Sequence, residues 1–155
     1  MIASNPATSL RGCTNFKLRQ LLRRVSLVYD RAMAESGLKI TQYSLLTHVE
    51  KLGPITQADL AKAMGMDSST LSRNLRPLES AGWVAEHAGG DARSHALSLT
   101  ASGRKKRMQA QSLWKQAQLQ LNDTVGVDDV IALHALIDRM TDALSADAIE
   151  EKDAA

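Results

Sequence analysis

An amphipathic helix is predicted over the residues Met66-Asp-Ser-Ser-Thr-Leu-Ser-Arg-Asn-Leu-Arg-Pro-Leu-Glu-Ser80. Its apolar positions recur at spacings of four and then three residues, at Leu71, Leu75 and Leu78. A turn of about 100° per residue places these three leucines within an arc of about 60°. Asp67 precedes them and is a good N-cap, because its side-chain oxygen accepts from a free backbone N–H of the first turn.

The opposite side of this helix carries short hydroxyls and two guanidinium groups, from Ser69, Ser72, Arg73 and Arg76. Short donors and acceptors at a helix N-terminus, with arginines behind them, suit entry into a DNA major groove. An ordinary surface helix has the same pattern, so the neighbouring elements decide between the two interpretations. Pro77 removes one backbone hydrogen bond, and we expect a kink there rather than the end of the helix.

The composition is that of one globular, mainly aliphatic domain. Of 155 residues, 44% are apolar and 23% charged, while only 3% are aromatic, which favours helices over sheets. The net charge of +2 is too small to indicate nucleic-acid binding. Between Pro54 and Gly103, four basic residues are outnumbered by five acidic ones. A positive surface must therefore arise from the placement of charges.

Cys13 is the only cysteine, which excludes an intramolecular disulfide and favours a reducing compartment. No apolar run approaches the roughly 18 residues of a membrane span. The first ten residues lack the basic and apolar regions of a signal peptide. We therefore expect a cytoplasmic protein without a membrane segment.

Before the helix predicted at 66–80, the apolar pattern predicts two helices, followed by the first helix of a helix-turn-helix. The first helix runs from Cys13 to about Glu35, and the second follows Thr41 as N-cap and stops at Gly53-Pro54. Ile55 is read as a short strand remnant. Thr56-Gln-Ala-Asp59 resembles a capping box at the start of a short helix. Gly65 makes the turn from this short helix into the helix at 66–80, which completes the helix-turn-helix.

After the helix at 66–80, the pattern predicts a β-hairpin and two long helices. Strands at 83–87 and 94–99 enclose a Gly-rich turn at 88–93, which together read as a wing. Thr100 caps a helix that Gly126 ends, and the last helix spans 127 to about 144. Its apolar face is too broad for a lone surface helix and suggests burial against a partner.

These elements, in this order, resemble the MarR family of winged-helix transcription regulators. The matching segments are Ile40-Thr-Gln-Tyr-Ser-Leu-Leu46, Ile55-Thr-Gln-Ala-Asp-Leu-Ala61, Met66-Asp-Ser-Ser-Thr-Leu-Ser-Arg-Asn-Leu75, Leu78-Glu-Ser-Ala-Gly-Trp83, Asp91-Ala-Arg93 and Leu97-Ser-Leu-Thr-Ala-Ser-Gly103. The resemblance covers most of the chain, from Cys13 to Leu144.

The resemblance implies a mainly α-helical winged helix-turn-helix fold with α+β character. It implies one domain over 13–145, in which 54–103 form the winged helix and 13–53 and 104–145 form dimerisation helices. Residues 1–12 and 146–155 are expected to be a flexible N-terminus and tail. It also implies a homodimer that binds a near-palindromic operator on double-stranded DNA, usually as a repressor, and that a small phenolic or aromatic ligand releases.

By position, the resemblance implies DNA contacts from the helix and from the wing: Ser68, Ser69, Thr70, Ser72, Arg73, Asn74, Arg76, Asp91 and Arg93. Arg73 is the strongest candidate for reading a base, since a bidentate guanidinium recognises guanine. Arg93 would enter the minor groove. Asp91 would fix the wing, although a simple turn residue explains it nearly as well. Ser94 and His95 stand where many members carry basic residues.

Candidates for other chemistry are few. A ligand pocket between the helical platform and the winged helix is predicted at Arg23, Tyr29, Met33 and His48, whose side chains mix apolar and polar character. Cys13 lies near the position of a reactive cysteine in some family members, including hydroperoxide sensors. A thiol-based redox regulator is therefore an alternative, and a plain, partly buried cysteine is the simpler interpretation.

Nothing in the sequence indicates catalysis, a metal or a cofactor. The motifs of phosphate loops, dinucleotide sites, hydrolase elbows and zinc peptidases are absent. His87 and His95 flank the hairpin, but two histidines without a nearby carboxylate or thiol are a poor zinc signature. A third functional class remains open, in which the winged helix binds a protein and not DNA.

Overall fold

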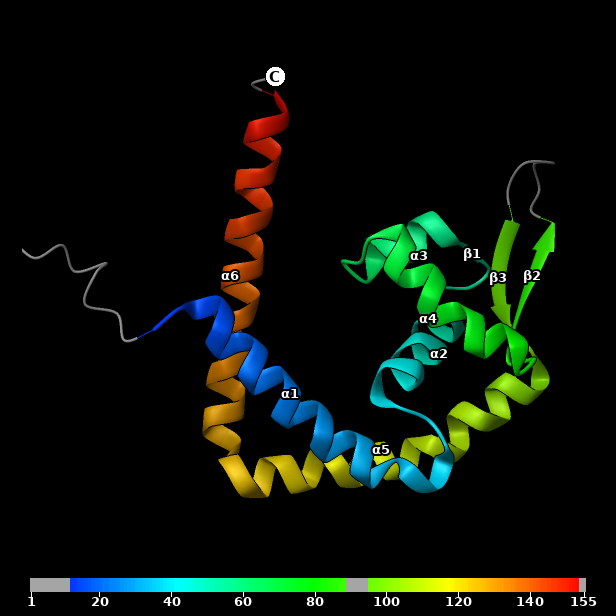
Figure 1. The fold of residues 1–155 in the computed structure, drawn as a ribbon, viewed down its shortest axis with the longest axis horizontal. Helices are drawn as coiled ribbons and strands as arrows, with labels where there is room; N and C mark the ends of the chain where they lie inside the picture. Colours follow the sequence, from blue (N-terminus) through cyan, green and yellow to red (C-terminus); the bar gives the residue numbers. More distant parts are fainter. Residues whose placement is uncertain (1–11, 89–94, 154–155) are drawn as a thin grey trace, which may run out of the picture. The chain divides into compact units, whose positions relative to one another are not determined.

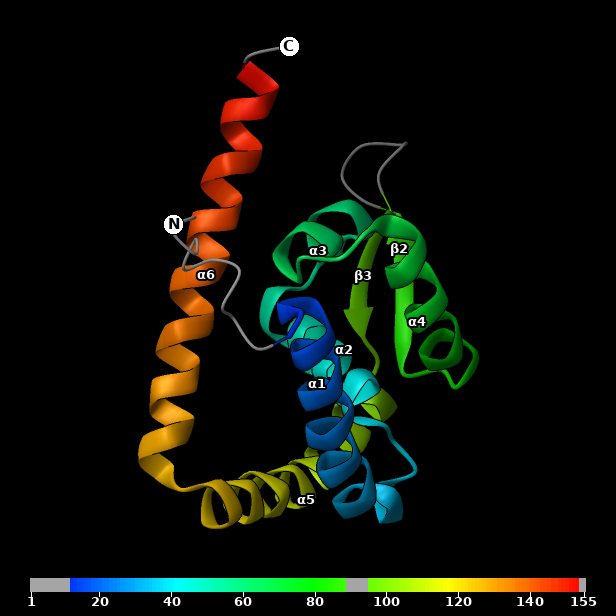
Figure 2. The ribbon, with the colours of Figure 1, turned by 60° about the vertical axis from the view of Figure 1, so that its left-hand side comes forward.

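The computed structural model describes residues 12–88 and 95–153 and divides the chain into two compact units, Met1–Ala117 and Gln118–Ala155. We call the first the winged-helix unit and the second the C-terminal unit. Figures 1 and 2 show the elements. In chain order they are α1 (Thr14–Ala32), the 3-10 helix η2 (Ala34–Ser36), α2 (Ile40–Leu52), β1 (Ile55–Thr56), α3 (Gln57–Ala63), α4 (Ser68–Ser80), β2 (Val84–Ala88), β3 (His95–Leu99), α5 (Ala101–Val125) and α6 (Val127–Asp153).

The predicted winged helix-turn-helix is confirmed by the structure. Thr56 caps α3, because its hydroxyl accepts from the Asp59 backbone N–H at 3.1 Å and donates to the Asp59 carboxylate at 2.8 Å. The turn to α4 needs a positive φ of 61° at Gly65, which glycine adopts without strain. Helix α4 continues through Pro77 to Ser80. The helix-turn-helix is therefore built from local capping signals.

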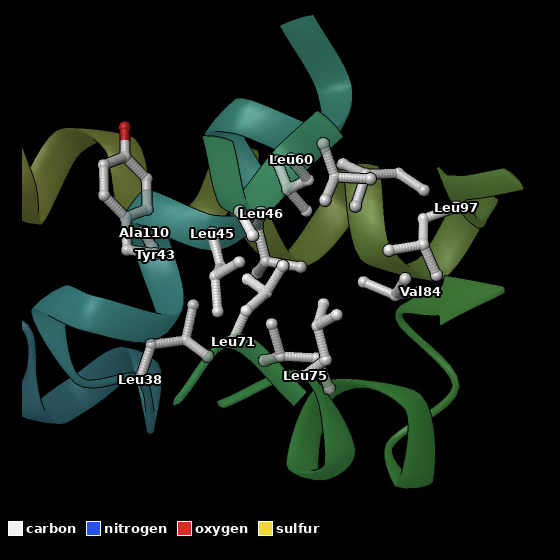
Figure 3. Close-up of a cluster of buried hydrophobic side chains, with 14 of the residues drawn as sticks. Leu38, Tyr43, Leu45, Leu46, Leu60, Leu71, Leu75, Val84, Leu97 and Ala110 are labelled. Carbon is white, nitrogen blue, oxygen red and sulfur yellow. The ribbon is translucent and has the colours of Figure 1, made fainter. Parts of the chain in front are cut away.

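The leucine face of α4 anchors that helix in the core of the winged-helix unit. Leu71, Leu75 and Leu78 are each no more than 1% exposed. They join a cluster that draws on every neighbouring element, including Leu45, Leu46, Val49, Leu60, Val84 and Leu97 (Figure 3). Each fully buried leucine contributes about 1.5–3 kcal/mol relative to exposure. The polar face of α4 is therefore held by an apolar core beneath it.

The sheet is antiparallel and its strand order is β1-β3-β2. Leu97 and Leu99 of β3 point into the core, while Ser98 between them points to the other face. This alternation is the period-2 pattern expected from the sequence. The hairpin of β2 and β3 stands beside β1 (Figure 1). Strand β1 includes the predicted Ile55, whereas β2 begins and ends one residue later than predicted.

The start of α5 is tied closely to the turn that follows α4. The Thr100 hydroxyl donates to the Gly82 carbonyl at 2.7 Å and accepts from the Gly103 N–H at 3.0 Å, which confirms Thr100 as the cap. Gly103 lies directly on the Trp83 backbone. Lys106 places its ammonium 5.0 Å from the centre of the Trp83 ring. The end of the helix-turn-helix and the start of α5 therefore form one junction.

Three helix boundaries differ from the predictions. The N-cap of α2 is Lys39 and not Thr41, because the Gln42 side chain accepts from the Lys39 N–H at 2.9 Å and Asp30 accepts from the Ile40 N–H at 2.8 Å. Helix α1 ends at Ala32 and not near Glu35. The last helix continues past Leu144 to Asp153, through Ala, Glu and Lys residues that favour helix.

Both terminal helices expose large apolar side chains. On α1 these are Phe16, Leu18, Leu21, Leu22 and Leu27. On α6 they are Val127, Ile131, Leu136, Ile137, Met140 and Leu144. None of the helices in the described part of the chain combines the length and hydropathy that a membrane span requires.

Candidate nucleic-acid interface

Asp67 organises the first turn of α4. Its carboxylate accepts from the Thr70 backbone N–H at 2.8 Å and from the hydroxyls of Ser69 and Thr70, each at 2.6 Å. These hydrogen bonds hold the pKa of the Asp67 carboxyl well below its usual range, and the bond from the Ser69 hydroxyl has the largest effect. The carboxylate therefore stays ionised at neutral pH and fixes both hydroxyls at the exposed tip of the helix.

Asp67→Asn should make the protein less stable than the wild type at neutral pH, because the amide is a weaker acceptor for these donors. Since the folded-state pKa is depressed, the stabilisation is present above the unfolded-state pKa and is lost as the pH falls through the folded-state value. The gap between the two proteins should therefore shrink progressively below about pH 4. Urea unfolding of both proteins from pH 7 to pH 2 measures this gap. An unchanged gap over that range would contradict the assignment.

The structure places Ser69, Ser72, Arg73 and Arg76 on the side of α4 opposite the buried leucines. Ser68, Ser69, Arg73 and Arg76 are exposed, whereas Thr70, Ser72 and Asn74 are half-buried. Arg73 donates to the Thr70 hydroxyl at 3.3 Å. Neither Arg73 nor Arg76 forms an ion pair with any residue in the described part of the chain. Their guanidinium groups are thus free to bind a phosphate or a base edge.

The two predicted wing contacts, Asp91 and Arg93, lie outside the described residues. The described base of the wing carries His87 and His95, which do not meet. His87 bonds to the Ser98 hydroxyl at 2.8 Å, and His95 lies 3.9 Å from the Glu86 carboxylate. No group of side chains that could hold a metal ion occurs among residues 12–88 and 95–153.

The four predicted ligand residues differ in their burial, and whether they bind a ligand stays a prediction. Met33 is fully buried in the core, and Tyr29 is buried, which raises its pKa above the usual value. Arg23 is exposed and lies about 15 Å from Met33 along the helix axis. His48 is half-buried, with Nδ1 2.8 Å from the Ser44 carbonyl. Packing in the core is enough to explain why an apolar residue stands at position 33.

Cys13 is a free, exposed thiol at the N-cap of α1. The expectation that it is partly buried is wrong, because residues 12–24 at the start of α1 are all exposed on the single chain. Tyr29 lies about 24 Å further along the helix axis, so it cannot contact the thiol of the same chain. Tyr43 stacks on Trp114, with ring centres 6.0 Å apart. The redox role of Cys13 remains a prediction.

Sequence reasoning missed two features of this unit. It assigned the Ser69 and Thr70 hydroxyls to DNA without their bonds to Asp67, although an acid two and three residues before hydroxyls is a recognisable signal. It also missed a cavity at the root of the hairpin, because residues from separate segments line it: Val49, Glu50, Gly53, Pro54, Ala85, His87, Ser98, Leu99, Thr100 and Arg104.

This chain is similar in sequence and in fold to known transcription regulators. A family model described as the MarR family matches residues 36–94. The chain is similar to the Mycobacterium tuberculosis transcriptional regulator MosR, solved in complex with DNA: 32% identity, TM-score 0.68, covering 83% of this chain and 98% of that one. It matches MarR from E. coli in fold, at 20% identity and a TM-score of 0.67 over 84% of this chain and 98% of that one. It is 28% identical over 90 residues to the HTH-type transcriptional regulator YwoH of Bacillus subtilis, covering 58% of this chain and 66%, just under two thirds, of that protein.

Proposed function

Because this chain belongs to the MarR family of transcription regulators, we propose that it binds double-stranded DNA as a homodimer and regulates transcription at a near-palindromic operator. One observation carries the proposal: the exposed face of α4 presents Arg73 and Arg76 without carboxylate partners in the described chain, on a helix anchored by buried leucines. The MosR structure, 32% identical, contains DNA and supports the same partner here.

The residues at the tip of α4 and those one turn further along the helix suit different kinds of DNA contact. The hydroxyls at its tip are fixed by Asp67 and can donate or accept at base edges or phosphates. Arg73, one turn further on, carries the planar fork that pairs with guanine O6 and N7. The buried leucines keep this face from rotating when DNA binds, which lowers the ordering cost of the complex.

Salt dependence separates DNA binding from the alternative of a protein-interaction module. A chain that neutralises phosphates should lose affinity for a random duplex linearly with log salt, with a slope of about −0.9 for each phosphate contacted. Fluorescence anisotropy of a labelled random duplex, titrated at several salt concentrations, gives this slope. A flat response, or no binding at low salt, would favour the interaction module.

A second copy of the chain is the proposed cover for the apolar faces of α1 and α6. The exposed leucines of α1 and the exposed Ile and Leu residues of α6 lie on the first and the last helix of the chain. A two-fold dimer sets two copies of α4 about 34–36 Å apart, which is one turn of B-DNA. The symmetry of the operator would then follow from the symmetry of the protein.

Leu22→Glu should convert the dimer to a monomer at micromolar concentration. Leu22 is 65% exposed in the single chain, so the free monomer tolerates the glutamate, whereas an apolar interface would bury an unpaired charge. Sedimentation velocity measures the two states. Gln20→Glu, at an exposed polar position of the same helix, is the matched control and should stay dimeric. A dimeric Leu22→Glu protein would contradict this interface.

We further propose that the protein acts as a cytoplasmic repressor and that a small aromatic or phenolic ligand releases it from DNA. This part rests on the family alone. Adding such compounds to the preformed DNA complex in the anisotropy assay tests it, with loss of the bound signal as the expected result. Retention of DNA with every compound would remove the effector part and leave DNA binding untouched.

A further inference from the structure

The hydrogen bonds at the tip of α4 all run toward one acceptor, the Asp67 carboxylate. Arg73 donates to the Thr70 hydroxyl at 3.3 Å, and that hydroxyl donates to one carboxylate oxygen at 2.6 Å. The Ser69 hydroxyl donates to the other carboxylate oxygen, also at 2.6 Å. An ionised carboxylate only accepts, so the direction of each of these bonds is fixed. The single hydrogen of each hydroxyl is therefore used inside the protein.

The Ser69 oxygen keeps its capacity to accept, on the exposed side of the helix. A hydroxyl has one hydrogen and two lone pairs. No donor from the described part of the chain reaches the Ser69 oxygen, whereas the Thr70 oxygen already accepts from Arg73 and is half-buried. Ser69 also shares with Arg73 the side of α4 opposite the buried leucines. It therefore presents an acceptor, and no donor, to whatever binds this side.

A DNA phosphate is a poor partner for the Ser69 hydroxyl. Phosphate oxygens only accept, so the hydroxyl would have to leave Asp67 before it could donate to one. At 2.6 Å the bond to Asp67 lies in the range of strong, charge-assisted hydrogen bonds. The exchange would replace one such bond by another and would leave the carboxylate beside a phosphate, where the two negative charges repel.

The major groove offers the complementary group on two of the four bases. Adenine presents its N6 amino group there and cytosine its N4 amino group, whereas guanine presents O6 and thymine O4, which are acceptors. The Ser69 oxygen can accept from an amino group without breaking its bond to Asp67. That bond also polarises the hydroxyl and makes it a stronger acceptor. The polarity of Ser69 is thus set before DNA arrives.

We propose that Ser69 reads an adenine or a cytosine by accepting a hydrogen bond from its amino group, and that Asp67 is the positioning residue that sets this direction. Arg73, on the same side of the helix, is a donor and suits the acceptor edge of guanine. The two side chains therefore read opposite kinds of base edge. This inference rests on the proposed function, because it assigns a hydrogen-bond direction within the same DNA interface.

Deletion of single amino groups from a bound duplex tests the reading by Ser69. In an operator recovered by selection from random DNA, each adenine is replaced in turn by unsubstituted purine and each cytosine by pyrimidinone, in both half-sites. For the wild type, one of these replacements should weaken binding about threefold to tenfold, the effect of one hydrogen bond. In Ser69→Ala the same replacement should have no further effect. This comparison cancels any effect of the analogue on the duplex itself.

Ser80→Ala is the matched control, because it removes an exposed hydroxyl from the other end of α4. It should respond to every analogue as the wild type does. Ser69 is exposed and Asp67 keeps its bonds to Thr70, so Ser69→Ala should fold normally. An operator without any amino group whose effect depends on Ser69, or the same loss of that dependence in Ser80→Ala, would overturn the proposal.

Asp67→Asn tests the positioning role. Asparagine is as good an N-cap as aspartate, so the helix should keep its start. The neutral amide holds the Ser69 hydrogen less firmly, so the hydroxyl gains the freedom to donate. At the base pair read by Ser69, the variant should therefore discriminate less between adenine and guanine, or between cytosine and thymine, than the wild type. A loss of affinity that is equal for all four bases would overturn the role of Asp67.

The outcomes for this inference and for the proposed function can be told apart. A chain that recovers no sequence from random DNA fails in its proposed function, and the assignment of Ser69 fails with it. A chain that recovers a two-fold operator but shows no amino group coupled to Ser69 keeps its function and loses only the assignment.

Discussion

Replacing Arg73 by alanine should weaken operator binding by about 1–3 kcal/mol, which is roughly five- to 150-fold in affinity. The side chain is exposed, lies one turn behind the fixed hydroxyls of the α4 tip, and has no carboxylate to leave behind. Its loss removes a bidentate donor without disturbing the leucine core. If Arg73 reads a base, the variant should also discriminate less at that base pair, because removal of a base contact relaxes specificity.

Competition between operator and random duplex at fixed salt measures both effects. Arg24→Ala is the matched control, since it removes the same charge from an exposed position on α1. The control should change affinity for both duplexes slightly and equally. Equal binding of the Arg73 variant and the wild type, or equal losses in the two variants, would exclude Arg73 as a reader of bases.

Gly103→Ala should cost about 3 kcal/mol of unfolding free energy, a large loss for a substitution that normally favours a helix. A Cβ at this position would meet the Trp83 carbonyl oxygen at 2.0 Å and its carbonyl carbon at 2.8 Å. Both atoms belong to backbone, which Thr100 and Ser102 hold through the Gly82 carbonyl. The start of α5 must therefore move away from the turn after α4, and overpacking of this kind typically costs 1–3 kcal/mol.

Urea unfolding of Gly103→Ala beside Gln109→Ala separates packing from helix propensity. Gln109 is exposed on the same helix, so its replacement by alanine changes propensity alone and should have little effect. A Gly103 variant as stable as the wild type would show that the two segments separate freely. The junction would then not couple the helix-turn-helix to α5.

The sequence predicted those parts of the fold whose signals are local. Each of these signals lies within a short segment of sequence. They are the spacing of Leu71, Leu75 and Leu78, the caps at Thr56, Asp67 and Thr100, and the glycines at turns. The capping of α2 was not predictable in this way. Its N-terminus is satisfied by Gln42 from within and by Asp30 from the preceding helix, and the second contact exists only after α1 and α2 pack.

The candidate sites divide in the same manner. The exposed face of α4 follows from helical periodicity, so its residues were predictable. The cavity at the hairpin root was not, because Arg104 and His87 are brought together only by the sheet and the start of α5. For Met33, periodicity alone could not distinguish a pocket from the core, and the structure assigns it to the core.

Selection of bound duplexes from a random DNA pool by the purified wild-type chain tests the proposed function most directly. The expected result is a two-fold symmetric motif whose half-sites lie about one helical turn, 10–10.5 base pairs, apart. In a parallel selection, Arg73→Ala should lose the preference at a matching base pair in each half-site. An unenriched pool, or a single motif without symmetry, would contradict a dimer that reads DNA through paired copies of α4.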